Sequence, residues 1–397
     1  FKVSDGYLKP LTEGSCLISE DLEGRTLSFF GDLHARYAGS VVKAMASAKY
    51  GVPLITKALS RLKKDREDPS IVRKKIEQAL TATIKAVNRL TPEVIEILIH
   101  SPAAAQQFQP GQFFRLQNYE NQAIRMNDQA LVMEGIAVRG AWVDKEQGLI
   151  SVVVSEVGAS SLLCQYLKPG EPIILMGPTG SPTVIPRHEK VLLIGEGLGN
   201  VGLLEIGKAM KMAGNEVHYL MGYEHPKDVV YRERAEQTAA FIYLTFKQPS
   251  KAWSLRTQDK LYQGSIVEAL KKFVETQHVT GLDRFLIMAS AKTMAAIEQA
   301  RPLLSNSLFK TKCQAVVSVN SPMQCMMKGV CGQCLQRHMD PLTGQESMVL
   351  SCRTQDQPLE KVDYESLQGR LKQNSLQEKI TALWMRHLLK ESSTKDC

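Results

Sequence analysis

Four cysteines near the end of the chain have the residue type and spacing of a metal site. Within 28 positions lie Cys325, Cys331, Cys334 and Cys352, separated by five, two and seventeen residues. Cysteine thiolates bind both iron–sulfur clusters and tetrahedral zinc. The spacing does not distinguish these two, and unliganded thiols are a third alternative. Cys313, in the apolar run "CQAVVSV", is expected in a protein core.

A second candidate site is the segment "VLLIGEGLGNVGLLEIGKAM", where an apolar strand leads through Gly195, Gly197 and Gly199 into a helix. Glycines let the backbone turn tightly and approach a phosphate, and the N–H groups at a helix start face an anion. This strand–turn–helix context predicts a dinucleotide site. A tight turn without a ligand is the alternative. Glu224 lies near the end of the next strand and leaves the choice between NADH and NADPH open.

Three turns precede that segment and have the chemistry of a phosphate site. After "FQPGQFFRLQ", the segment "SEVGASSLL" contains Gly158, Ser160 and Ser161, and "MGPTGSP" contains Gly177 and Gly180. Backbone N–H groups and hydroxyls can bind a diphosphate. Each turn alone is a common loop, so their order along the chain carries the prediction.

The elements that would position these residues differ in period. Between 84 and 186 the apolar residues alternate in short runs with turns between them, which predicts a small antiparallel barrel. From 190 to 304, continuous apolar runs such as "KVLLIGEG" and "RFLIMAS" alternate with helical segments. That pattern predicts a doubly wound α/β domain with a parallel sheet. At the end, "KITALWMRHLLK" predicts a helix with Trp384 as a packing anchor.

Charge and composition exclude several classes of protein. The formal net charge of the 397 residues is +8, and much of the excess lies between Lys57 and Lys75. Acidic residues are interleaved there and aromatic residues are not, so a solvated helix face is favoured over nucleic-acid binding. A docking surface for an acidic partner stays open. No run of 18 apolar residues is present, which argues against a membrane span.

The cysteine usage and the chain start suggest a location and a context. A local cysteine cluster without an export signal is typical of a reducing compartment, so we expect a cytoplasmic protein. The chain begins with Phe1, and we expect it to be a piece of a longer protein.

The order of these motifs resembles the ferredoxin–NADP reductase superfamily. Within that superfamily, "PGQF", "EVGASS", "GPTG" and "LLIGEGLGNVGLL", followed by a cysteine cluster, are most similar to the dihydroorotate dehydrogenase electron-transfer subunit. The small subunit of NADH-dependent ferredoxin:NADP oxidoreductase is also similar. The resemblance covers roughly residues 80 to 370. It implies that the barrel turns bind FAD, the glycine turn and Glu224 bind NAD(P)H, and the four cysteines bind a [2Fe–2S] cluster.

Two motifs depart from the family pattern. The family has an arginine motif for the FAD diphosphate on a barrel strand, where this chain reads "LVMEGIAVRGAWVD". Arg139 is out of register with that motif, and Glu134 has the wrong charge. The first cysteine spacing is one residue longer than the family's, which places Met326 at the usual ligand position. Cys325 is therefore the expected ligand.

A separate resemblance concerns the start of the chain. Gly31 and Asp32 after an apolar strand, then Gly39 and "VVKAM", resemble the closing FAD motif of glutamate synthase small-subunit and pyridine nucleotide–disulfide oxidoreductase families. An α/β tail without this role is the alternative.

Taken together, these patterns and resemblances predict an α+β multidomain fold. Its expected parts are a tail of an upstream flavoprotein-like domain (1–55), a charged helical linker (56–80), an FAD-binding β-barrel (81–187), an NAD(P)-binding α/β domain (188–305), a small [2Fe–2S] domain (306–365) and a C-terminal helix (366–397).

The resemblance implies an electron-transfer flavoprotein oxidoreductase. Electrons would pass from NAD(P)H through FAD to the [2Fe–2S] cluster, and then to a partner protein or to a fused upstream flavoprotein domain. No catalytic Ser–His–Asp set is evident in the sequence. Two alternatives stay open: a non-catalytic zinc-binding interaction module that kept the fold without FAD, and a reductase of small molecules with a purely structural cluster.

Overall fold

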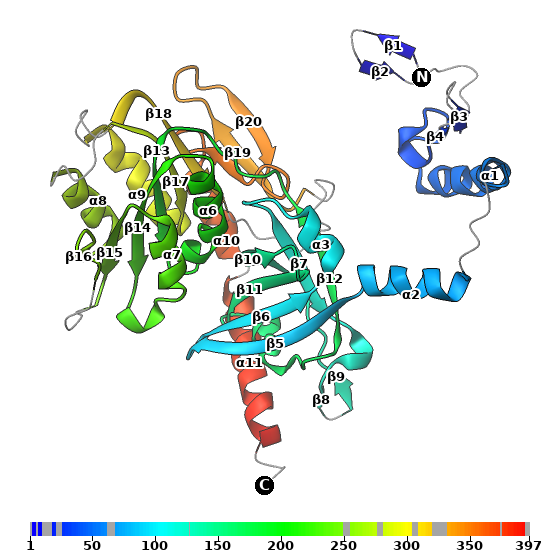
Figure 1. The fold of residues 1–397 in the computed structure, drawn as a ribbon, viewed down its shortest axis with the longest axis horizontal. Helices are drawn as coiled ribbons and strands as arrows, with labels where there is room; N and C mark the ends of the chain where they lie inside the picture. Colours follow the sequence, from blue (N-terminus) through cyan, green and yellow to red (C-terminus); the bar gives the residue numbers. More distant parts are fainter. Residues whose placement is uncertain are drawn as a thin grey trace. The chain divides into compact units, whose positions relative to one another are not determined.

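The structure is a computed structural model that divides into two compact units, residues 1–74 and 75–397 (Figure 1). The described residues are 2–4, 7–9, 18–20, 26–61, 68–126, 128–248, 255–275, 281–303, 309–319, 332–373 and 375–393.

The first unit contains two short strand pairs and a long helix. The strands β1 (Lys2–Ser4) and β2 (Tyr7–Lys9) pair, as do β3 (Ile18–Glu20) and β4 (Thr26–Ser28). Helix α1 (Val41–Leu59) follows a turn in which the Gly31 backbone N–H donates to Ser47 Oγ over 2.7 Å. Asp32, from the segment that resembles a closing FAD motif, accepts a hydrogen bond from the Gly39 N–H at 3.1 Å. Helix α2 (Pro69–Leu80) begins at a proline and contains the boundary between the units.

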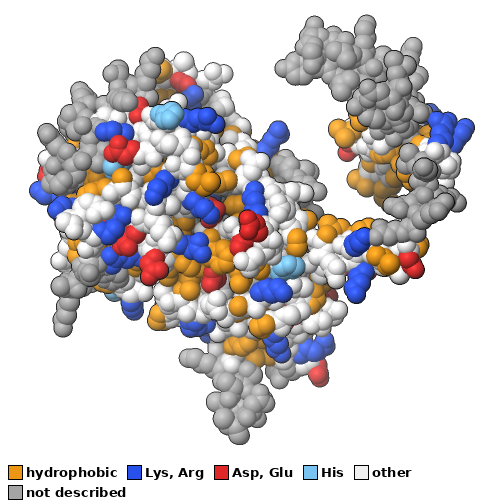
Figure 2. All heavy atoms as spheres, viewed as in Figure 1, with side chains coloured by type: hydrophobic (Ala, Val, Ile, Leu, Met, Phe, Trp, Pro, Cys, Tyr) orange, Lys and Arg blue, Asp and Glu red, His pale blue; other side chains and the backbone are white. Residues whose placement is uncertain are grey.

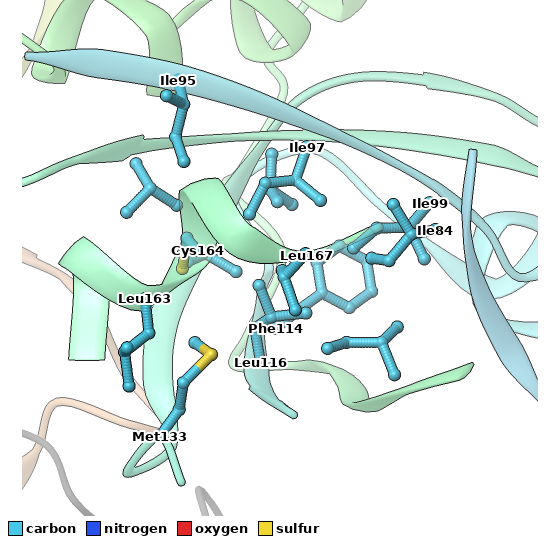
Figure 3. Packing of buried hydrophobic residues seen from close by; sticks show 14 of the residues in the cluster. Ile84, Ile95, Ile97, Ile99, Phe114, Leu116, Met133, Leu163, Cys164 and Leu167 are labelled. Atoms are coloured by element: carbon cyan, nitrogen blue, oxygen red, sulfur yellow. The ribbon is translucent and has the colours of Figure 1, made fainter. Parts of the chain in front are cut away.

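The second unit begins with the predicted antiparallel barrel, which is closed. Its strands follow the order β10-β11-β6-β5-β12-β7. They are β5 (Ala82–Thr91), β6 (Val94–His100), β7 (Phe113–Asn118), β10 (Ile136–Asp144), β11 (Leu149–Ser155) and β12 (Pro172–Thr179). Alternate side chains point inward, as the period-two pattern predicts. Figure 3 shows Ile84, Ile97 and Phe114 packed inside with Cys164 and Leu167 from the segment after β11. The short helices α3 (Pro102–Gln107) and α4 (Ala159–Leu163) lie in the connections.

The α/β part has a seven-stranded sheet in the order β16-β15-β14-β13-β17-β18-β21. Its parallel strands are β13 (Lys190–Glu196), β14 (Glu216–Tyr223), β15 (Phe241–Phe246), β16 (Lys260–Gln263), β17 (Leu282–Met288) and β18 (Phe309–Ser318). Strand β21 (Asp356–Pro358) is antiparallel at the edge. The sheet therefore takes two strands from the segment 306–365. Cys313 in β18 is buried in the core, as predicted.

Helices cover both faces of this sheet (Figure 1). Leu192 and Ile194 of β13 pack with α8 (Ile266–Glu275), α9 (Ala291–Ala300) and α10 (Tyr364–Gln373). The side chains of Val191 and Leu193 point to the other face, where they pack with α6 (Leu204–Met212) and α7 (Arg232–Thr238). Burial on both faces explains why the strands read as continuous apolar runs.

The last helix, α11 (Ser375–Ser393), packs against the barrel rather than standing alone. Its Ala382, Met385 and Leu389 side chains are buried in the barrel core cluster. The prediction that Trp384 anchors this helix is wrong, because its side chain is 51% exposed. Along a helix, residues 382, 385 and 389 share one face and residue 384 points away from it.

Two observations concern the classes of protein that the composition argues against, which are membrane-spanning and nucleic-acid-binding proteins. No helix in the described ranges is long and apolar enough to cross a membrane. On the face shown in Figure 2, lysine and arginine side chains are interspersed with aspartate and glutamate rather than gathered in one basic patch.

Candidate functional site

The predicted glycine turn connects β13 to α5 (Gly199–Gly202), and each glycine has a steric reason. A Cβ on Gly195 would lie 2.1 Å from Asn200 Oδ1, and one on Gly199 would lie 1.9 Å from the Met288 carbonyl oxygen. Gly197 has a φ of +56° and no atom within 4 Å of a Cβ placed on it. Two glycines thus let the turn pack closely on its neighbours, whereas Gly197 provides an open, left-handed backbone position.

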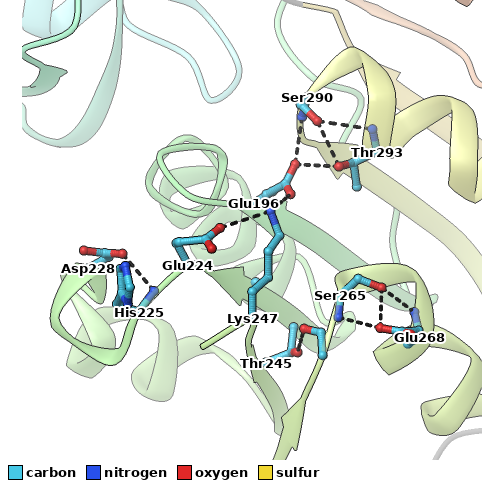
Figure 4. A network of polar contacts seen from close by, with 12 residues as sticks. Glu196, Glu224, His225, Asp228, Thr245, Lys247, Ser265, Glu268, Ser290 and Thr293 are labelled. Carbon is cyan, nitrogen blue, oxygen red and sulfur yellow. Dashed lines mark hydrogen bonds and ion pairs between the residues drawn. The ribbon is translucent and has the colours of Figure 1, made fainter. Parts of the chain in front are cut away.

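A chain of charged side chains surrounds this turn at the carboxyl ends of the strands (Figure 4). Glu196, the last residue of β13, accepts hydrogen bonds from Thr293 Oγ1 at 2.7 Å and from the Ser290 N–H at 3.2 Å. Burial acts to raise the pKa of Glu196, but these bonds and the Lys247 charge outweigh it and lower the pKa. Lys247 follows β15 and forms ion pairs with Glu196 and with Glu224 at 3.5 and 3.3 Å. Glu224 is therefore at the predicted strand end, with a cationic partner.

A cavity of about 250 Å³ lies between this edge of the sheet and the barrel. The sheet side contributes Gly199, Gly202, Met288, Ala289, Ser318 and Val319. The barrel side contributes Phe113, Ala137, Val138 and Arg139. Ala289 lines the cavity, whereas Ser290 caps α9 by accepting from the Thr293 N–H. The predicted turn is therefore part of a cavity wall shared with the barrel.

Two arginines lie on the outer face of the barrel, and one of them, Arg139, lines this cavity. In the β7–β10 pairing, Phe113 faces Arg139 and Arg115 faces Ala137, while Phe114 points into the core. These four outward residues share one face of the sheet. Their side chains reach different neighbours. Arg115 Nη1 donates to Met176 Sδ at 3.5 Å, whereas a Cβ on Gly202 would lie 3.0 Å from Arg139 Cδ.

The contacts of the two arginines differ. Arg139 donates to Ser318 Oγ at 2.9 Å and weakly to the Gly111 carbonyl oxygen at 3.4 Å. Burial lowers the pKa of Arg139, and the Asp356 charge opposes this effect. Arg115 Nε is buried without a hydrogen-bond partner among the described residues. A Cβ on Gly135 would lie 2.0 Å from Arg115 Nε, so the glycine makes room for this side chain. The structure therefore brings an incompletely satisfied cation to the barrel face.

The predicted turn Gly158–Ser161 is occupied by the chain's own side chains. Ser161 Oγ accepts a hydrogen bond from the Gly158 N–H at 2.9 Å, and Ser160 Oγ accepts one from the Glu134 N–H at 3.0 Å. Helix α11 also reaches the turn, since a Cβ on Gly158 would lie 3.0 Å from Glu378 Oε2. A carboxylate thus lies where a diphosphate is predicted.

Gly177 and Gly180 lie against the barrel strand that borders the cavity. Their φ angles are +128° and +82°, conformations that favour glycine. A Cβ on Gly177 would lie 3.0 Å from the Phe113 carbonyl oxygen, and one on Gly180 would lie 2.8 Å from Phe113 Cε1. Both glycines allow the chain to wrap closely around Phe113, and their role toward a ligand stays a prediction.

Two of the four predicted metal ligands pack in one cluster with Phe113. Cys334 and Cys352 are 0% and 1% exposed and form a buried cluster with Phe113. The Cys352 N–H donates to Cys334 Sγ at 3.3 Å. Both thiols are free of disulfide bonds. Cys325 and Cys331 lie outside the described residues, and no group of three or more potential ligands is found within the described ones.

Comparison with known proteins agrees with this architecture, although no family model matches the chain. An uncharacterised protein of Rickettsia prowazekii is 34% identical over 355 residues, which is 89% of this chain and 41% of that protein. The homologue of the dihydroorotate dehydrogenase B (NAD(+)) electron-transfer subunit from Thermotoga maritima is 33% identical over 145 residues, 36% of this chain and 47% of that protein. The chain thus spans less than half the length of these two relatives.

A solved structure extends the comparison to more than three quarters of the chain. The structure of the NADH-dependent reduced ferredoxin-NADP oxidoreductase aligns with a TM-score of 0.63 and 25% identity, covering 78% of this chain and 98% of that one. The chain has the ferredoxin–NADP reductase fold and is homologous to dihydroorotate dehydrogenase electron-transfer subunits.

Within this ferredoxin–NADP reductase fold, the residues fit a flavin only in part. Arg115 adds a positive charge on the barrel face, where the family's arginine motif is absent from its usual register. Its buried Nε, which has no hydrogen-bond partner among the described residues, is chemically suited to a phosphate or a ring carbonyl. Glu378 argues against a flavin at the predicted position, because its carboxylate lies beside Gly158, where a diphosphate is predicted. Sequence reasoning missed Arg115, although the alternation of "GQFFRLQ" could have identified it as the outward side chain between Phe114 and Leu116.

Proposed function

We propose that the chain is an electron-transfer oxidoreductase that passes electrons from NAD(P)H through FAD to a [2Fe–2S] cluster. The observation that carries the proposal is the position of Phe113. Its ring lies in one buried cluster with Cys334 and Cys352, and it also lines the cavity that borders the glycine turn. One aromatic side chain therefore belongs both to the wall of the candidate hydride-transfer cavity and to the cluster with two candidate metal ligands.

Residues of this chain would hold the three groups in sequence. The turn Gly195–Gly199 and Glu224 would bind the nucleotide, and Ala289 leaves space beside the turn for its ring. Arg115 and Arg139 would neutralise the negative charge of a flavin on the barrel face. When bound, FAD accepts a hydride and releases the two electrons singly, which suits a one-electron acceptor held by Cys325, Cys331, Cys334 and Cys352.

The acceptor beyond the cluster belongs to the same proposal. A partner protein or a fused upstream flavoprotein domain would take electrons from the cluster. The domain boundaries and the cytoplasmic location stay predictions.

The test is anaerobic reconstitution of the full chain with iron, sulfide and FAD, followed by NADH or NADPH titration with visible and electron paramagnetic resonance spectra. We expect flavin bands, acid-labile sulfide and a cluster signal that grows after flavin bleaching. Cys334→Ser and Cys352→Ser should lose the cluster signal, and the buried Cys313→Ser, whose thiol lies in a different core cluster, should keep it. A colourless protein with one equivalent of zinc would refute the proposal and support the zinc-binding alternative.

A further inference from the structure

Helix α11 is apolar on two sides, and one of them faces solvent. The side that holds Ala382, Met385 and Leu389 is buried in the barrel core cluster. A surface helix of a globular protein usually has one apolar stripe toward the core and a polar face opposite. Here a second stripe of large apolar side chains, each more than half exposed, consists of Leu376, Ile380, Leu383 and Trp384. We call these four side chains the α11 ridge.

The α11 ridge is continuous along the helix. At about 100° of rotation for each residue, its positions fall within an arc of about 100° and extend over about 12 Å. Helix α11 continues from α10 and packs on α4, both of which lie away from this arc because the buried side meets them. Contiguous exposed apolar side chains of this kind mark a surface that contacts another molecule or a membrane.

The charges beside the ridge are positive. Lys379 and Arg386 lie along one flank, both exposed, and uncharged residues lie along the other. Arg386 Nη2 donates to the Glu156 carbonyl oxygen at 3.1 Å, which holds this cation at the edge of the barrel. Between positions 376 and 387 the acidic residue is Glu378, which lies beside Gly158 on the barrel side. The ridge therefore fits an occupant that is apolar and negatively charged.

Area and charge favour a membrane surface over a protein as that occupant. Four partly exposed side chains of this size present roughly 300–600 Å². A stable protein interface buries roughly 800 Å² on each partner. A second copy of the ridge would also offer no anionic group to Lys379 and Arg386. A membrane needs no matching pocket, because apolar side chains enter beneath the headgroups while lysine and arginine contact anionic lipids.

We propose that the α11 ridge docks this chain on membrane surfaces that contain anionic lipids. Its four apolar side chains enter the boundary between headgroups and acyl chains, and Lys379 and Arg386 contact the lipid phosphates. The formal net charge of +8 adds attraction at longer range. Binding is reversible and weakens with added salt, because few side chains enter and the charges are screened. None of the residues proposed to bind a cofactor belongs to the ridge.

The test is co-sedimentation of the full chain with vesicles of phosphatidylcholine and phosphatidylglycerol in equal parts, and with vesicles of phosphatidylcholine alone. We expect tighter binding to the mixed vesicles, and binding that falls as sodium chloride is added. Leu383→Gln and Trp384→Gln should each weaken binding about tenfold, since each removes an apolar side chain from the ridge. Lys379→Gln should weaken binding about fivefold on the mixed vesicles alone.

Two substitutions elsewhere are the matched controls. Leu342→Gln removes an exposed leucine from the turn between β19 (Leu335–Met339) and β20 (Glu346–Leu350). Lys260→Gln removes an exposed lysine from β16, at the edge of the seven-stranded sheet. Neither should change the affinity for vesicles.

Three results would overturn the membrane assignment. They are a wild type that stays in solution with the mixed vesicles, an equal loss of binding in the controls, and a ridge variant whose melting temperature falls. The last result would show that protein already covers the ridge. Light scattering of Leu383→Gln then identifies the cover, because a smaller particle than the wild type would mean a second copy.

Discussion

The two strand-to-helix turns of this chain contain similar residues but have different surroundings. The turn at Gly195–Gly199 opens on a cavity, because its neighbouring carboxylate, Glu196, is turned toward Ser290 and Thr293. The turn at Gly158–Ser161 is covered, because both serine hydroxyls are engaged and Glu378 of α11 lies beside Gly158. Glycine and serine spacing can predict a phosphate-binding shape, but access to that shape depends on residues far away in the chain.

The largest effect is expected from closing the open turn. In Gly199→Ala the new Cβ would overlap the Met288 carbonyl oxygen, so the backbone must move. We expect a loss of about 2–4 kcal/mol in the free energy of unfolding and no measurable nucleotide binding. Urea denaturation and calorimetry check this. Gly369→Ala in α10 is the control. Nothing lies within 4 Å of a Cβ at this position, so the substitution should raise the free energy of unfolding by about 0.5–1 kcal/mol.

A smaller effect is expected from replacing Arg115, which lies on the outer face of the barrel. Arg115→Ala should weaken FAD binding by about 1.5–3 kcal/mol, because a hydrogen bond to a charged group is lost. Flavin fluorescence titration measures it. Arg125→Ala is the control, since Arg125 is exposed and its side chain donates to the nearby Asp128 carbonyl oxygen. An unchanged FAD affinity in Arg115→Ala would show that this cation does not serve a flavin.

Neutralising the Glu378 carboxylate should make the turn at Gly158–Ser161 slightly more favourable for an anion. Glu378→Gln should strengthen FAD binding by about 0.5–1 kcal/mol, because a partly exposed negative charge near an anion is removed. Glu365→Gln in α10 removes the same charge elsewhere and should not change the affinity. Weaker FAD binding in Glu378→Gln would mean that this side chain supports the ligand.

The smallest effect concerns the carboxylate beside the open turn. Hydrogen bonds from Thr293 and Ser290 lower the pKa of Glu196 below 4.5 against the effect of burial. A lowered pKa in the folded state stabilises the protein above the unfolded pKa, and this stability is lost as the pH falls through the folded value. Glu196→Gln should therefore cost about 0.5–1 kcal/mol at pH 7. The difference from the wild type in thermal melts should shrink as the pH falls below 4.5 and vanish once the folded-state carboxylate is protonated, and a constant difference would contradict the assignment.

The sequence predicted the elements whose side chains repeat with a simple period. The alternating residues around Ile97 and Leu116 identified the barrel, and the apolar run at Val191–Ile194 identified a strand buried on both faces. Contacts between distant segments could not be predicted. The approach of Glu378 to Gly158 depends on how α11 packs on the barrel, and the exposure of Trp384 depends on which helix face was buried. Likewise, the sequence predicts that Phe113 lies in a strand, but its contact with Cys334 and Cys352 depends on tertiary packing.

The packing between barrel and sheet also constrains how a ligand can enter. Ala141 and Val153 of the barrel are buried in the same apolar cluster as Leu193 and Leu204 of the α/β part. Pulling the two lobes apart would expose this shared apolar surface, at about 25 cal/mol for each Å². Hinge opening is therefore an unfavourable route for exchange. A nucleotide should instead slide in along the strand ends, and its residence time should depend on side-chain rearrangement there rather than on lobe motion.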